Sequence, residues 1–139
     1  MRLAFYKARR GGFAGLFDAA VRWWTRGPYS HVELVFADGI AASASQRDGG
    51  VRLKRITFAP DRWDFVPVAG DEAAARAWFA CYEGAGYDYA GLFGFIWRPG
   101  NGHGQRWFCS EAVAAALGVS DPWRFCPNTL AAALTAQRG

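Results

Sequence analysis

The sequence predicts an α+β domain in which a small antiparallel sheet is accompanied by helices. Strand-like segments follow one another between residues 30 and 68, and turn signals separate them. Apolar residues recur at helical spacing before and after that region. The chain has 139 residues and carries no internal repeat or low-complexity linker. This is the size of one domain, so we expect residues 1–139 to form a single one.

The first half of the chain contains most of the predicted strands. A helix is expected at residues 13–24, because apolar side chains recur there every three to four positions and a Gly-Pro pair follows. The segment at residues 51–56 alternates apolar and basic side chains, which is typical of an edge or half-exposed strand. The strands are expected at residues 3–6, 30–37, 40–45, 51–56 and 63–68.

The second half is predicted to be mainly helical. Asp71 is expected to cap a helix that runs to Tyr82, and Asn128 to cap a last helix at residues 129–136. The aromatic segment at residues 87–96 begins beside Asp88, another possible cap, and a glycine-rich loop follows at residues 98–104. The order of strands followed by helices supports the α+β class.

Composition narrows the possible functions without choosing among them. The net charge of +4 and the pI of about 9.3 suit an anionic partner but give no specific indication of nucleic acid binding. Three cysteines argue against a disulfide framework, and the two histidines stand apart, so we expect no metal and no cofactor. The sequence shows neither a signal-peptide pattern nor a transmembrane segment, which predicts a cytoplasmic location. The oligomeric state is left open.

The segment RWFCSEAVAAAL at residues 106–117 suggests a reactive thiol. Its pattern predicts a helix that begins at or just after Cys109 and stops at Gly118. A thiol at a helix start lies at the positive end of the helix dipole, which favours the thiolate. The alternative is a structural, half-buried cysteine. The other two thiols, Cys81 and Cys126, are expected to be protected because each lies beside aromatic residues.

The segment PYSHVELVF at residues 28–36 supplies a candidate base. If residues 37–39 form a three-residue loop with Gly39 in the left-handed conformation, His31 lies opposite Ser45 and Glu33 opposite Ser43. These four polar side chains then share one face of the hairpin. A two-residue loop would instead place His31 opposite Gln46. The alternatives are a structural histidine and a solvated Glu33, and a surface role is expected for His103, in the loop at residues 98–104.

Together, PYSHVELVFADG and WFCSEAVAAAL resemble the permuted papain-like cysteine peptidases related to the NlpC-type cell-wall hydrolases. The likeness is greatest to small members from phages and prophages, and the lecithin–retinol acyltransferase family shares the same permuted order. The resemblance covers roughly residues 6–130. It implies a permuted papain-like fold with Cys109 as nucleophile and His31 as base. The third polar residue of the family matches Ser43, where relatives more often carry a carboxylate or a second imidazole, and Glu33 on the same face is an alternative.

The favoured function is therefore thiol-dependent hydrolysis of an amide bond. By the resemblance, the substrate would be a peptidoglycan-type or other peptide, and the protein could be carried in or released with a phage particle. A first rival is an acyltransferase or lipid-ester thiol hydrolase, which a groove lined by Trp97, Trp107 and Phe108 would favour. A second rival is a non-catalytic binding or virion structural module on the same scaffold.

Overall fold

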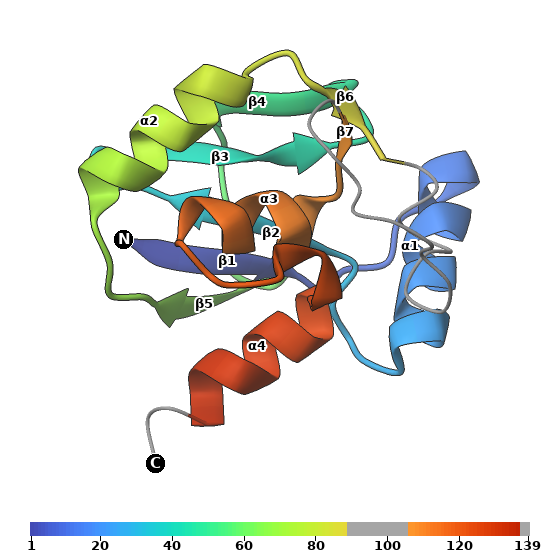
Figure 1. Ribbon diagram of the computed structural model, residues 1–139. Coiled ribbons are helices and arrows are strands. Elements are labelled where there is room, and N and C mark those ends of the chain that lie inside the picture. Colours follow the sequence, from blue (N-terminus) through green and yellow to red (C-terminus); the bar gives the residue numbers. More distant parts are fainter. Residues whose placement is uncertain (89–105, 137–139) are drawn as a thin grey trace.

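The computed structural model describes residues 1–88 and 106–136, which form a sheet of seven strands with four α-helices (Figure 1). The strands are β1 (Arg2–Tyr6), β2 (His31–Val35), β3 (Ile40–Ser45), β4 (Gly50–Arg55), β5 (Trp63–Pro67), β6 (Gly86–Tyr87) and β7 (Arg106–Trp107). The helices are α1 (Gly12–Thr25), α2 (Glu72–Tyr82), α3 (Cys109–Ala116) and α4 (Pro127–Ala136), and a 3₁₀ turn spans Pro122–Arg124. The predicted α+β class with an antiparallel sheet is thereby confirmed.

The strands are not arranged in the order in which they occur in the chain. The order across the sheet is β5-β1-β2-β3-β4-β6-β7, and every neighbouring pair is antiparallel except β6 with β7. The predicted simple meander is wrong at β5, which returns to β1 and places Trp63 opposite Tyr6. Of the two alternatives for residues 51–56, the edge strand is wrong, because β4 lies between β3 and β6, while the half-exposed strand is confirmed by the partial exposure of β4.

One face of the sheet carries the main core. Apolar side chains alternate along the strands, so every second residue points to this face. Helix α3 packs across β2 and β3, and α2 packs against α3 and β4 (Figure 1). Fully buried members of this core are Leu3, Phe5, Val32, Leu34, Ala42, Ala44, Phe79 and Val113. The opposite face of the same strands therefore carries the side chains at the intervening positions.

The start of α3 agrees with the sequence prediction. The helix begins at Cys109, and the carboxylate of Glu111 accepts a hydrogen bond from the backbone N–H of Phe108 at 3.4 Å. This contact satisfies a group at the helix start and places a negative charge in the first turn, where the dipole favours it. Gly118, with φ of 74°, follows the end of the helix in the left-handed conformation.

Of the two predicted capping residues, Asp71 of α2 and Asn128 of α4, the structure confirms only the first. Asp71 caps α2 as predicted, because its side chain accepts from the N–H of Ala74 at 3.0 Å. Asn128 does not cap α4, since its side chain contacts Thr25 and Tyr29 instead. At the start of α4 the N–H of Cys126 donates to the Thr129 hydroxyl at 2.9 Å. The predicted loop at residues 98–104 and most of the aromatic segment at residues 87–96 lie outside the described residues.

Candidate active site

The hairpin of β2 and β3 has the register expected for a three-residue loop. Leu34 lies opposite Ala42 and Val35 opposite Ala41, and the N–H of Phe36 donates to the carbonyl of Ile40 at 2.9 Å. Gly39 has φ of 83°, which is the left-handed conformation that such a loop requires. The pairing ends at Leu34 and Ala42, so the expected pair of Glu33 and Ser43 lies one residue beyond it. The alternative two-residue loop is excluded.

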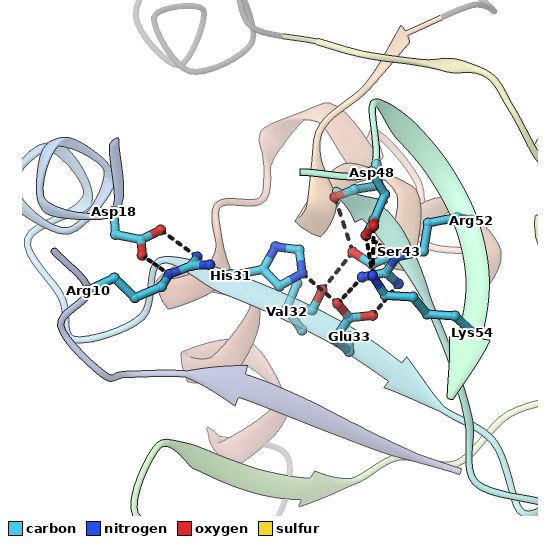
Figure 2. A network of polar contacts seen from close by, with 10 residues as sticks. Arg10, Asp18, His31, Val32, Glu33, Ser43, Asp48, Arg52 and Lys54 are labelled. Carbon is cyan, nitrogen blue, oxygen red and sulfur yellow. Dashed lines mark hydrogen bonds and ion pairs between the residues drawn. The ribbon is translucent and has the colours of Figure 1, made fainter. Parts of the chain in front are cut away.

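His31 and Glu33 form the centre of the polar face. They lie two residues apart on β2, so both side chains point to the side opposite Val32. Nε2 of His31 lies 2.7 Å from Oε1 of Glu33 (Figure 2). The Glu33 side chain is only 1% exposed and that of His31 is 17% exposed. The alternative of a solvated Glu33 is thus excluded, because its carboxylate is buried and contacts the imidazole directly.

Ser43 is buried and has other partners. Its hydroxyl donates to the carbonyl of Val32 at 2.7 Å and approaches the carbonyl of Ala44 at 3.3 Å. The β2–β3 pairing ends at Leu34, so the serine satisfies a backbone acceptor of β2 where the strand pairing has stopped. Of the two candidates for the third group, the structure places Glu33, and not Ser43, against the ring of His31.

Arg52, which the sequence analysis did not single out, holds Glu33 from β4. Its guanidinium donates to both Glu33 oxygens, with Nη1 to Oε2 at 2.6 Å, and its Nε donates to Asp48 at 2.8 Å. Asp48 also accepts from Lys54 at 2.7 Å, so charges of opposite sign alternate along the row (Figure 2). Arg52 lies opposite Ser43 in the β3–β4 ladder, which explains how it reaches this face. In the sequence, the alternation of basic and apolar residues at 51–56 was the feature that could have pointed to Arg52.

Cys109 also acts electrostatically on His31. Burial of the ring lowers the pKa of His31, but the charge of Cys109 and then that of Glu33, with hydrogen bonds to both, raise it from 6.5 to about 9. Burial raises the pKa of Glu33, but the Arg52 hydrogen bonds and the charge of His31 lower it from 4.5 to about 2. Since Nε2 faces Glu33, Nδ1 is the ring nitrogen available to the thiol. The site therefore favours imidazolium and carboxylate as charged neighbours.

A cleft opens beside this polar row. It has a volume of about 300 Å³, and its walls include His31 and Glu33 together with residues of α1 and the aromatic rings of Tyr6 and Trp63. Basic side chains outnumber acidic ones in the lining, which includes Arg10, Arg47, Arg52, Lys54, Arg62, Asp18, Glu33 and Asp48. Cys109 has no exposed surface and is not part of the lining. The imidazole is thus accessible from the cleft, while the sulfur lies beneath the surface.

The other two cysteines and the aromatic residues expected to line a groove differ in their exposure. Cys126 is buried as expected, but Cys81 is exposed on α2, so the expectation that it is protected is wrong. Phe108 is 2% exposed within the core, and the half-buried Trp107 packs against Trp78 and Tyr82. Trp97 and His103 lie outside the described residues. Of the two rings that the structure describes, that of Phe108 is therefore too buried to line the acyl-chain groove expected for the first rival.

Within residues 1–88 and 106–136, no group of three or more His, Cys, Asp or Glu side chains is arranged to hold a metal ion. Among the helices of the same residues, none combines the length and the apolar character needed to cross a membrane. Comparisons of the chain with protein families, with curated protein sequences and with solved structures found no match. The functional argument therefore depends on the geometry of the site.

Proposed function

We propose that the chain is a thiol-dependent amide hydrolase, a cysteine peptidase or amidase with a permuted papain-like fold. The observation that carries this proposal is that His31 contacts a carboxylate, with Glu33 2.7 Å from Nε2, while the charge of Cys109 raises the pKa of the same ring. A nucleophile, a base and a group that orients the base are the minimum set for this chemistry.

In the proposed mechanism, His31 and Cys109 share one proton. With a pKa of about 9, the ring holds that proton at neutral pH. The sulfur attacks the carbonyl carbon, and the backbone N–H of Cys109, at the first turn of α3, donates to the developing oxyanion. The imidazolium then gives its proton to the leaving amine, and the ring next takes a proton from the water that hydrolyses the thioester. Glu33 keeps the ring oriented throughout.

The surplus of basic side chains in the cleft supports a substrate that carries carboxylates. Arg10, Arg52 and Lys54 are each paired with a carboxylate of the cleft lining. Among the described residues, Arg47 and Arg62 are not paired with a carboxylate of the lining, and Arg62 contacts Asp61 outside it. A peptide with free carboxyl groups, such as a peptidoglycan stem peptide, fits this charge. Such a substrate also agrees with the family resemblance.

Because Cys109 is buried, catalysis requires a local opening that exposes its sulfur. Substrate reaches a sulfur with no exposed surface only when the local structure opens. A non-catalytic module on the same scaffold would keep the thiol buried until the whole domain unfolds. The rate at which Cys109 reacts, compared with the rate of global unfolding, separates these two functions.

The test is alkylation with iodoacetamide across pH, with the labelled site mapped by mass spectrometry. Because Cys81 is exposed, the experiment uses a Cys81→Ser background. We expect Cys109 to react faster than the domain unfolds and faster than Cys126, and His31→Ala to slow that reaction at pH 6–7. His103→Ala is the control and should leave the rate unchanged. Reaction of Cys109 only at the unfolding rate, or a pH profile unaffected by His31→Ala, would reject the proposal.

A further inference from the structure

Helix α1 turns its apolar side toward solvent. On a helical projection, seven residues share one arc of about 140°, and all seven are exposed. Phe13 is 78% exposed, Leu16 70% and Trp23 77%. The complete set, which we call the α1 ridge, is Gly12, Phe13, Leu16, Ala19, Ala20, Trp23 and Trp24. The ridge contains no charged or polar side chain.

The polar residues of α1 face the protein instead. Asp18 is 2% exposed and accepts from Nε of Arg10 at 2.7 Å. Arg22 donates to the carbonyl of Ala8 at 3.0 Å, and the Thr25 hydroxyl donates to the carbonyl of Val21 at 2.7 Å. An amphipathic helix on a globular protein ordinarily buries its apolar stripe and exposes the polar one. In α1 this arrangement is reversed, which leaves a large aromatic surface without a partner among the described residues.

A basic hollow lies next to the ridge. Its walls are formed by Lys7, Arg9, Arg10 and Arg22 together with the ring of Trp23. Arg9 is exposed and has no ion-pair partner among the described residues, and Arg26 is exposed at the C-terminal cap of α1. Lys7 pairs with Asp64 at 2.6 Å and Arg10 with the buried Asp18, but no acidic side chain lines the hollow itself. Apolar and cationic surfaces are thus adjacent on one side of the molecule.

We propose that α1 docks on an anionic phospholipid membrane, with the α1 ridge in the boundary between headgroups and acyl chains and the basic hollow on the lipid phosphates. Tryptophan, phenylalanine and leucine bordered by Lys and Arg are the side chains that interfacial helices use. A second copy of this chain is a poorer occupant, because it would bring a like-charged hollow toward the first one. With 14 residues, α1 is too short to cross the bilayer, so the attachment is peripheral.

The inference is independent of the proposed hydrolase activity, although α1 also contributes Ala14 and Phe17 to the cleft wall. The test measures binding of the full chain to sucrose-loaded vesicles by co-sedimentation. The vesicles are made either of phosphatidylcholine alone or of phosphatidylcholine with phosphatidylglycerol. We expect binding to the anionic vesicles, weaker binding to the neutral ones, and release as the salt concentration increases.

Matched variants separate the ridge and the hollow from general surface effects. Trp23→Glu should lower vesicle binding by about tenfold or more, while Trp123→Glu, the same change at another exposed tryptophan, should not. Arg9→Ala should lower binding by about fivefold, while Arg124→Ala, also exposed, should have little effect. These positions are exposed, so the variants are expected to remain folded.

Two results would overturn the proposal. One is failure of the wild-type chain to bind anionic vesicles more tightly than neutral ones. The other is a dimer in analytical ultracentrifugation that Trp23→Glu dissociates, because the ridge would then serve a second copy of the chain. Neither result depends on the alkylation of Cys109, so the hydrolase proposal can fail or stand separately.

Discussion

The Glu33 carboxylate and the His31 imidazole, two residues apart on one strand, lie 2.7 Å from each other and are both charged at neutral pH. A strand normally presents residues i and i+2 side by side without a bond between them. Here the contact occupies Nε2 and leaves Nδ1 as the other polar atom of the ring. Glu33 is therefore the residue of β2 on which the orientation of the base depends.

The first prediction compares the two candidates for the third group. In the Cys81→Ser background, Glu33→Gln should slow alkylation of Cys109 at neutral pH by roughly tenfold, because it removes a charge-assisted contact to the imidazolium. Ser43→Ala should change the rate by less, since its hydroxyl serves the Val32 carbonyl. Circular dichroism of each variant checks that it is folded. Equal or opposite effects would mean that Ser43 supports the ring.

The second prediction concerns stability as a function of pH. The pKa of His31 is raised to about 9 from 6.5, so its contribution is complete below about pH 6.5 and is lost as the pH rises toward 9. The pKa of Glu33 is lowered to about 2 from 4.5, so its contribution is complete above about pH 4.5 and is lost as the pH falls toward 2. Urea unfolding should show both contributions in full between these limits.

His31→Gln provides the comparison for that measurement. The variant should lose the part of the alkaline decline that belongs to this ring, while most of the acid limb remains. If wild type and His31→Gln decline in parallel between pH 6.5 and 9, the raised pKa of His31 does not contribute to stability.

The third prediction tests Arg52 as the support of Glu33. Arg52→Met should lower the free energy of unfolding by about 3–5 kcal/mol, because it leaves a buried carboxylate without its bidentate partner. Lys54→Met on the same strand is the control and should cost less than about 1 kcal/mol, since Lys54 is 44% exposed. Chemical denaturation measures both. A similar loss of unfolding free energy in the two variants would show that the Glu33–Arg52 pair contributes no more to stability than an exposed pair.

The fourth prediction concerns the contact between α4 and the loop after α1. Asn128 accepts from the N–H of Tyr29 at 3.0 Å and donates to its carbonyl at 2.9 Å and to Thr25 at 2.6 Å. A Cβ on Gly27 would lie 2.2 Å from Oδ1 of Asn128. Gly27→Ala should therefore displace this side chain and cost about 3 kcal/mol, at roughly 1 kcal/mol for each of the three hydrogen bonds lost.

A double-mutant cycle decides whether that cost comes from Asn128. Asn128→Ala should be destabilising by a similar amount, and Gly27→Ala should cost little in the Asn128→Ala background. Gly11→Ala is the matched control, because no atom lies within 4 Å of the added Cβ and the expected change is below about 0.5 kcal/mol. Additive costs in the cycle would contradict the proposed clash.

Local patterns predicted much of the fold and part of the site. The period-two alternation and Gly39 fixed the hairpin register, and the apolar run after Cys109 located the start of α3. Arg52 was missed because its partner is 19 positions away and its alternating strand resembles a solvated one. Strands β6 and β7 have two residues each, too few to show a period. The periodicity of α1 predicted a helix, but periodicity does not tell toward which side an apolar face points.

The inward-facing polar side of α1 has a consequence for the order in which the molecule opens. Val21 is the only large apolar side chain of α1 that is fully buried, and the described polar attachments of the helix run through Asp18, Arg22 and Thr25. Charged and hydrogen-bonded attachments contribute little net free energy compared with a packed core. Amide hydrogens of α1 should therefore exchange with solvent through a local opening, while those of β2 and β3 exchange only with global unfolding. The domain would then consist of two cooperative units of unequal stability within one chain.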